Sequence, residues 1–226
     1  MNAPTIRFDN GAAYEEFMGK WSRLAGDAFL RWLDPERGWR WVDVGCGNGA
    51  FTQELVDRCA PLGVTGIDPS AEQVEYARQR LAAGAVNFDV GDAMALPYAD
   101  NVFRATTMAF GGRNVPDLTG AFREMNRVMA PGGRAVFLEL NRPRMFGFKQ
   151  LFDFYFHTFS PLIGGLVSGD REAYSYLPRS VDHFESVGDI AACMRDAGMR
   201  DIEVYRLMFG VAVVHVGTKP ATAQTS

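Results

Sequence analysis

Two kinds of hydrophobic pattern alternate along the chain as far as residue 140. Short apolar runs typical of buried strands are separated by segments whose apolar residues recur every three or four positions, which is typical of helices. The strand-like runs are residues 39–44, 62–67, 86–90, 103–110 and 134–140. Because this alternation characterises βαβ units, the sequence predicts a mostly parallel α/β sheet covered by helices on both faces.

Two of the intervening segments have clear helical spacing. Residues 70–83 carry Val74, Ala77 and Leu81 on one face, behind Ser70 as a favourable N-cap. A second apolar stripe predicts a helix that the "APGG" sequence at 130–133 ends. The members of this stripe are Leu118, Ala121, Phe122, Met125, Val128 and Met129.

The pattern changes after residue 141. Residues 143–182 are rich in phenylalanine and are broken by proline and glycine, and they predict a helical lid inserted into the domain. Two interpretations of this segment remain open. It is either a lid that lines an apolar pocket and contacts a membrane surface, or a cap or homodimer contact buried in the ordinary way. Its apolar side chains include Phe146, Phe148, Leu151, Phe152, Phe154, Phe156 and Phe159.

The last part of the chain returns to regular patterns. Residues 186–198 have helical spacing, and residues 202–208 and 211–218 predict two strands around a Phe-Gly turn. With 226 residues, of which 47% are apolar, the chain is long enough for one domain with a full core. We expect this domain to span residues 1–220, with residues 221–226 as a disordered tail.

Charge and cysteine content limit the partners and the location. The net charge of −4 gives no basic surface for nucleic acid, so we expect no nucleic-acid partner. The three cysteines are odd in number and widely spaced, and the N-terminus lacks the basic and apolar run of a secretory signal. No apolar stretch has the length of a membrane span. The sequence predicts a cytoplasmic protein that at most lies at a membrane surface.

A cluster of glycines follows the first strand-like run. Gly45, Gly47 and Gly49 in "VDVGCGNGAF" lie at the predicted carboxyl end of that strand, where open α/β sheets bind ligands. Their G-x-G-x-G spacing differs from the G-x-G-x-x-G of dinucleotide sites, which weighs against a dinucleotide-dependent oxidoreductase. A tight turn without a ligand remains the alternative interpretation.

Two aspartates follow the next two strand-like runs. Asp68 ends the second run, where a carboxylate can accept hydrogen bonds from both hydroxyls of a ribose; the alternative is an N-cap box with Ser70. Asp92 follows the third run and could accept the exocyclic amine of an adenine; the alternative is a solvated turn residue. Together with the glycines, the aspartates indicate a nucleoside-containing ligand.

In this order and spacing the glycine motif, Asp68, "GDAMALPY" and "RVMAPGGRAVFLEL" resemble the class I S-adenosylmethionine-dependent methyltransferases over residues 38–140. The resemblance implies a Rossmann-like seven-stranded sheet whose last strand is antiparallel. A non-catalytic binder on the same fold would be expected to lose Asp68 or the glycines, and both are present. The resemblance also implies contacts to S-adenosylmethionine from Gly45, Gly47, Asn48, Asp68, Asp92, Ala93 and Ala109.

The C-terminal half supports a narrower resemblance. "FGGRNVPDL" (110–118), residues 159–184 and residues 209–220 resemble the ubiquinone and menaquinone biosynthesis C-methyltransferases, whose substrates are polyprenyl quinols. Three features depart from that family: the glycine loop is not A-G-G-T-G-D, "GGRN" replaces "GLRN", and Arg104 stands where an aspartate is usual. A generic O-, N- or C-methyltransferase of a hydrophobic metabolite therefore remains the alternative.

The segment after the fourth strand-like run contains the candidate catalytic residues. Methylation of a quinol carbon requires a phenolate held in line with the methyl donor, so positioning and a fixed cation are the main needs. The resemblance favours Arg113 and Asn114 for this role. The alternative is that Arg113 pairs with a surface carboxylate and Asn114 caps the helix that begins near Asp117. No metal is expected, because His157, His183 and His215 lack ligand spacing.

Overall fold

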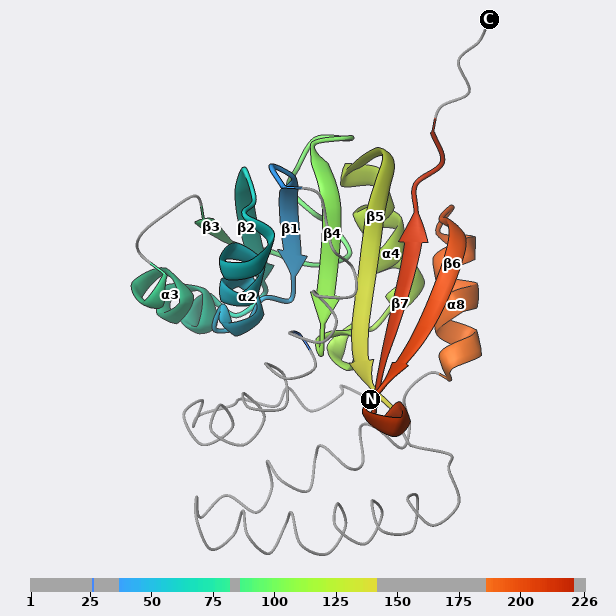
Figure 1. Cartoon of the computed structure of the whole chain (residues 1–226). Helices are drawn as coiled ribbons and strands as arrows, with labels where there is room; N and C mark the ends of the chain where they lie inside the picture. Colours follow the sequence, from blue (N-terminus) through green and yellow to red (C-terminus); the bar gives the residue numbers. More distant parts are fainter. Residues whose placement is uncertain (1–25, 27–36, 82–85, 142–185, 222–226) are drawn as a thin grey trace, which may run out of the picture.

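The computed structural model describes residues 26, 37–81, 86–141 and 186–221, which form a seven-stranded sheet with helices packed against it (Figure 1). The strands are β1 (Arg40–Val44), β2 (Gly63–Asp68), β3 (Val86–Val90), β4 (Phe103–Ala109), β5 (Met129–Leu140), β6 (Arg200–Leu207) and β7 (Ala212–Thr218). The α-helices are α2 (Ala50–Cys59), α3 (Ala71–Arg80), α4 (Leu118–Val128) and α8 (Val187–Asp196). Two short 3-10 helices are η1 (Gly112–Asn114) and η3 (Met208–Gly210).

The strand order is β3-β2-β1-β4-β5-β7-β6. Strands β1 to β5 pair in parallel, and β7 is antiparallel to both of its neighbours, β5 and β6. The prediction of a mostly parallel sheet with an antiparallel last strand is therefore confirmed. The chain moves outward from β1 to β3 and then returns to β4 on the other side of β1, which makes the β1/β4 boundary the topological switch point.

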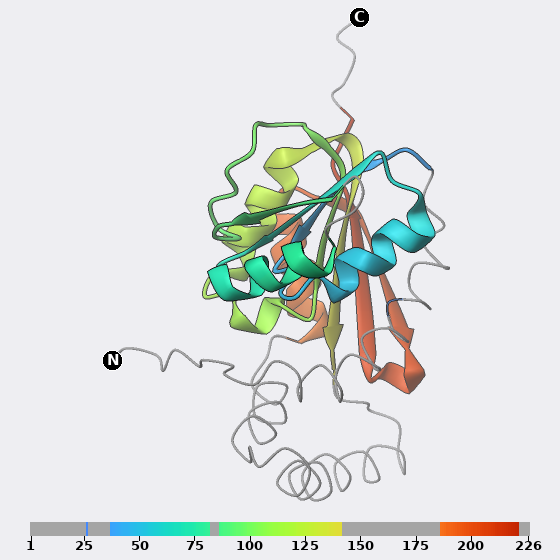
Figure 2. The ribbon, with the colours of Figure 1, turned by 90° about the vertical axis from the view of Figure 1, so that its left-hand side faces the viewer.

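Helices cover both faces of the sheet, as predicted. Helices α2 and α3 lie on one face, and α4 and α8 pack side by side on the other (Figures 1 and 2). On the second face, Phe122 of α4 meets Phe137 of β5 edge to face, with ring centroids 5.2 Å apart. Both side chains are fully buried, and burial of a phenylalanine stabilises the fold by about 1.5 to 3 kcal/mol.

Two predicted boundaries are wrong. Met129 was expected on the helical stripe, but the helix ends at Val128 and Met129 pairs with Phe103 as the first residue of β5. The register shift that follows places "APGG" within β5, not between a helix and a strand. Phe110 was expected in the fourth strand, but its φ of 58° is incompatible with strand backbone and β4 ends at Ala109.

Several predictions lie partly or wholly outside the described residues. These are the lid at 143–182, nearly all of the 221–226 tail, and the single domain over 1–220 in its N-terminal part. Within the ranges that the structure describes, no helix is long and apolar enough to cross a membrane.

Candidate functional site

The glycine loop connects β1 to α2 at the carboxyl edge of the parallel strands. Gly45, Gly47 and Gly49 have φ values of 72°, 51° and 77°, a region that side chains other than glycine rarely adopt. A Cβ on Gly49 would lie 2.9 Å from the Leu81 side chain, whereas a Cβ on Gly47 would meet none of the described residues within 4 Å. Gly49 therefore serves helix packing, while Gly47 leaves open backbone at the sheet edge.

Asp68 links the glycine loop to the start of α3. One carboxylate oxygen accepts the Gly47 N–H at 2.9 Å and the other accepts the Ser70 N–H at 2.9 Å. Ser70 caps α3 by accepting the Gln73 N–H, so Asp68 is not itself the cap. Burial raises the pKa of Asp68, opposed by the two N–H donors. Each carboxylate oxygen keeps a second acceptor site, which a ribose hydroxyl can use.

Asp92 and Ala93 lie in the loop that follows β3. Asp92 is exposed, and its Oδ1 accepts the Met94 N–H at 2.8 Å. Ala93 is half-buried against the core cluster between the sheet and α4. The arrangement leaves the Asp92 carboxylate accessible at the sheet edge beside Asp68.

Helix α4 holds this loop in place. Arg127 donates to the carbonyls of Leu96 and Tyr98, both at 2.8 Å, and Glu124 accepts the Leu96 N–H at 2.8 Å. Glu124 also pairs with Arg127 at 2.8 Å, which lowers the pKa of the Glu124 carboxyl. The loop that carries Asp92 is therefore fixed by side chains 28 to 31 residues further along the chain.

The switch point brings the ends of β1 and β4 together. A Cβ on Gly45 would lie 3.8 Å from the Gly111 Cα, so the two loops run within contact distance. Ala109 ends β4, and the Phe110 N–H that follows donates to the Leu138 carbonyl at 2.8 Å. Asn48, on the β1 side, accepts the Ala50 N–H through its side chain at 3.1 Å.

Arg113 lies in η1, immediately after this contact, and pairs with Glu139 at the end of β5. Its Nε is 2.9 Å from Glu139 Oε1, and the two side chains are only 4% and 2% exposed. A terminal guanidinium nitrogen also lies 3.4 Å from the Phe110 carbonyl oxygen. Arg113 therefore does pair with a carboxylate, as the alternative interpretation expected, but this carboxylate is buried and not at the surface.

Asn114 is exposed at the end of η1, where its backbone N–H donates to the Gly111 carbonyl. Helix α4 is capped by Asp117, whose side chain accepts the Gly120 N–H at 2.9 Å. The alternative in which Asn114 caps this helix is therefore wrong. The structure brings Arg113 and Asn114 to the same edge as Gly45, Gly47 and Asp68.

Glu139 was not identified from the sequence. Burial raises the pKa of its carboxyl, opposed by the Arg113 guanidinium and by the backbone N–H groups of Leu140 and Arg113. The available signal was a single acidic residue inside the apolar run "AVFLEL". Such a residue in a buried strand requires a partner.

Asp43, on β1 below the glycine loop, was also missed. Its two carboxylate oxygens accept hydroxyl hydrogen bonds from Thr52 at 2.7 Å and Thr107 at 3.0 Å. Burial raises its pKa from 3.8 to about 6, against the effect of both hydroxyls. This carboxylate ties α2 and β4 to β1 directly beneath the site.

We expect Asp43→Asn to remove a pH dependence of stability. Because the pKa of Asp43 is raised in the folded state, the folded protein holds a proton that the unfolded chain releases from about pH 4, so stability falls as pH rises towards 6. Thr107 Oγ1 also lies 3.4 Å from the Val42 carbonyl, so it can donate there and accept from the new amide. At pH 7 the variant should be more stable by about 1 to 3 kcal/mol, and the difference should shrink towards pH 4.

Urea unfolding of wild type and Asp43→Asn between pH 4 and 7 measures this difference. Asp57→Asn, which changes an exposed carboxylate on α2, is the matched control. Parallel stability profiles of wild type and Asp43→Asn would contradict the expectation.

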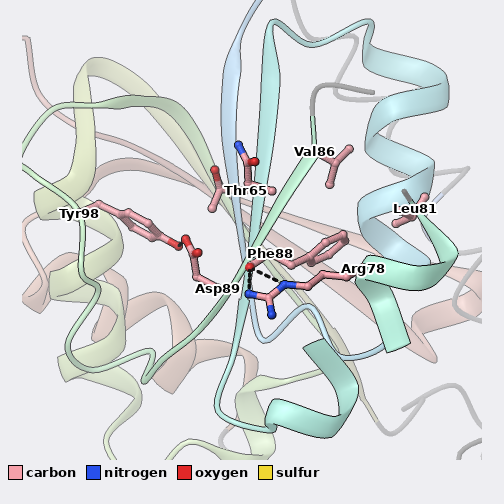
Figure 3. A pocket seen from close by; sticks show the side chains of 8 residues that line it. Thr65, Arg78, Leu81, Val86, Phe88, Asp89 and Tyr98 are labelled. Carbon is pink, nitrogen blue, oxygen red and sulfur yellow. Dashed lines mark hydrogen bonds between the residues drawn. The ribbon is translucent and has the colours of Figure 1, made fainter. Parts of the chain in front are cut away.

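A hollow of about 390 Å³ lies at the outer edge of the sheet, near β3 (Figure 3). Arg78 extends along it and donates to the Phe88 carbonyl at 2.6 Å, while Tyr98 donates to Asp89 at 3.0 Å. None of the predicted cofactor or catalytic residues lines this hollow. The site at the switch point is therefore a separate feature. In the described ranges no cluster of His, Cys, Asp and Glu could hold a metal ion.

The model of the ubiE/COQ5 methyltransferase family matches residues 20–219. The chain belongs to this family. The demethylmenaquinone methyltransferase of Geobacillus kaustophilus is 40% identical over 194 residues, which cover 84% of this chain and 83% of that protein. The ubiquinone/menaquinone biosynthesis C-methyltransferase UbiE of Geotalea daltonii is 41% identical over 185 residues, covering 80% and 78%.

Solved structures agree with the fold of a ubiE/COQ5 family member. A SAM-dependent methyltransferase from Aquifex aeolicus superposes with a TM-score of 0.68 at 18% identity, covering 94% of this chain and all of the other. The chain is accordingly an S-adenosylmethionine-dependent methyltransferase. Its site fits the nucleoside part of that cofactor, because the open backbone at Gly47 and the remaining acceptor sites of Asp68 suit a ribose.

Proposed function

We propose that this methyltransferase methylates a ring carbon of a polyprenyl quinol in quinone biosynthesis. The names of its relatives, demethylmenaquinone methyltransferase and ubiquinone/menaquinone biosynthesis C-methyltransferase, support this reaction. The structural observation that carries the proposal is the buried Arg113–Glu139 pair beside the contact between Gly45 and Gly111. A fixed cation there is suited to a substrate that reacts as an anion.

The cofactor side of the site is also a proposal. We infer that the backbone at the β1 and β4 ends approaches S-adenosylmethionine, with Asp68 accepting from the ribose and Asp92 from the adenine amine. The bound cofactor would supply an electrophilic methyl group. The residues that we assign to it are Gly45, Gly47, Asn48, Asp68, Asp92, Ala93 and Ala109.

The negative charge that forms on the quinol during the reaction determines which residues the substrate side of the site requires. A quinol becomes nucleophilic at carbon when one hydroxyl loses its proton to water. The ring carbon would take the methyl group that bound S-adenosylmethionine supplies, with S-adenosylhomocysteine as the leaving thioether. Loss of the ring proton to water would then restore aromaticity. Arg113 would stabilise the phenolate oxygen, directly or through a water, and the exposed residue Asn114 would orient the ring.

The test is methyl transfer to demethylmenaquinol carried in liposomes, with mass spectrometry locating the methyl on the ring. Methylation of the quinol at carbon supports the proposal, and no turnover with benzoquinols or naphthoquinols would favour a generic methyltransferase of another hydrophobic metabolite.

Sedimenting the same liposomes tests the predicted peripheral membrane contact, which rests on the phenylalanine-rich residues 143–182. Sedimentation equilibrium of the protein alone tests the homodimer.

A further inference from the structure

We propose that Glu139 is a positioning residue, which holds the Arg113 guanidinium at the edge where methyl transfer occurs. The inference rests on the proposed function of Arg113, which lies in η1, and extends it to Glu139 on β5. It begins from the ion pair between Arg113 Nε and Glu139 Oε1 at 2.9 Å.

The Arg113–Glu139 pair is buried, and burying two charges has a desolvation cost that stability alone does not explain. Exposure is 4% for the Arg113 side chain and 2% for the Glu139 side chain. Desolvating two charges offsets most of their mutual attraction, so a buried ion pair is often no more stable than an apolar pair of similar volume. A cation held at a fixed place is what the pair provides and an apolar pair would not.

The backbone around the pair fixes the carboxylate and the arginine together. Glu139 Oε1 also accepts the Leu140 N–H at 2.9 Å, which ties the carboxylate to its own strand. A Cβ on Gly112 would lie 2.4 Å from the Phe137 ring and 3.6 Å from Glu139 Oε2, so η1 packs directly onto β5. Arg113 follows Gly112 in that turn, and its position is therefore set by β5.

The second oxygen of Glu139 adds an independent observation. Oε2 is buried without a hydrogen-bond partner among the described residues. Leaving a carboxylate oxygen unsatisfied has a free-energy cost of about 1 to 3 kcal/mol or more. Arg113 Nε and the Leu140 N–H therefore both meet the carboxylate at Oε1, the oxygen that holds the guanidinium.

The primary test is Glu139→Gln, which keeps the side-chain volume and removes the charge. We expect kcat for quinol methylation to fall about 10- to 100-fold through loss of arginine orientation. The affinity for S-adenosylhomocysteine should stay within about two-fold of wild type. Glu203→Gln, a carboxylate on the outer strand β6, is the control and should keep its kcat.

A double variant shows whether Glu139 acts through Arg113. In an Arg113→Ala background, adding Glu139→Gln should change kcat by less than about two-fold, because the interaction is already lost. A further tenfold loss in Arg113→Ala/Glu139→Gln would overturn the proposal, as would wild-type kcat in Glu139→Gln. If Glu139→Gln alone does not fold, a tenfold loss of kcat on adding Glu139→Gln to Arg113→Ala still overturns the proposal, because neither of these two proteins contains the uncompensated arginine.

The outcomes separate this inference from the proposed function. No methylation of the quinol by the wild-type protein would overturn the proposed function. Wild-type kcat in Arg113→Ala would leave quinol methylation standing and overturn both the catalytic role of Arg113 and the positioning role of Glu139. Loss of kcat in Arg113→Ala with normal kcat in Glu139→Gln would overturn the positioning role alone.

Discussion

Arg113→Ala should lower kcat for quinol methylation by about 10² to 10³, the usual effect of removing one preorganised donor to a developing anion. If Arg113 stabilises charge on the phenolate oxygen, its contribution appears mainly in the transition state, so the affinity for the cofactor should be preserved. Asn114→Ala should also lower kcat for the methyl transfer step, because both residues lie in η1 just after β4.

Single-turnover methylation by both variants, with calorimetric titration of S-adenosylhomocysteine alongside, measures the two effects separately. Arg134→Ala, an exposed arginine at the amino end of the parallel part of β5, is the matched control. Thermal unfolding is needed as well, since Arg113→Ala leaves Glu139 buried without its cation. Near-normal turnover in both variants would show that the pair is structural. Loss of cofactor affinity with normal turnover at saturation would place the two residues in the cofactor pocket.

The fold was largely predictable because its signals are local. Most of the parallel strands coincide with a short apolar run, and α3 has its own apolar stripe and the Ser70 N-cap. The errors occur where a distant partner overrides local preference. Met129 continues the stripe of α4, yet the ladder with Phe103 takes it into β5.

The site was predictable to the extent that a residue's own neighbours define its role. Gly45, Gly47 and Asp68 were found because glycine spacing and strand ends are visible in the sequence, and the structure places them at one edge. Pairing across the sheet was not predictable. Arg113 and Glu139 are 26 residues apart and meet only because β4 and β5 are neighbours in the sheet.

Asp68→Ala should weaken binding of S-adenosylmethionine by about 1.5 to 3 kcal/mol, roughly 10- to 150-fold in Kd, because two hydroxyl contacts to a charged acceptor are lost. The structure refines this expectation, since Asp68 also accepts the Gly47 and Ser70 N–H groups. Asp68→Asn keeps the size and one acceptor oxygen of the side chain, so it should retain part of the affinity.

Ser70→Ala separates cofactor binding from helix capping. It removes the cap of α3 and leaves the Asp68 carboxylate in place, so it should cost about 1 kcal/mol of stability with cofactor affinity unchanged. Calorimetric titration and urea unfolding of the three variants give the two quantities independently. Wild-type affinity in Asp68→Ala would show that a residue other than Asp68 binds the ribose. An equal loss of affinity in Ser70→Ala would mean that the start of α3, and not the carboxylate, shapes the cofactor site.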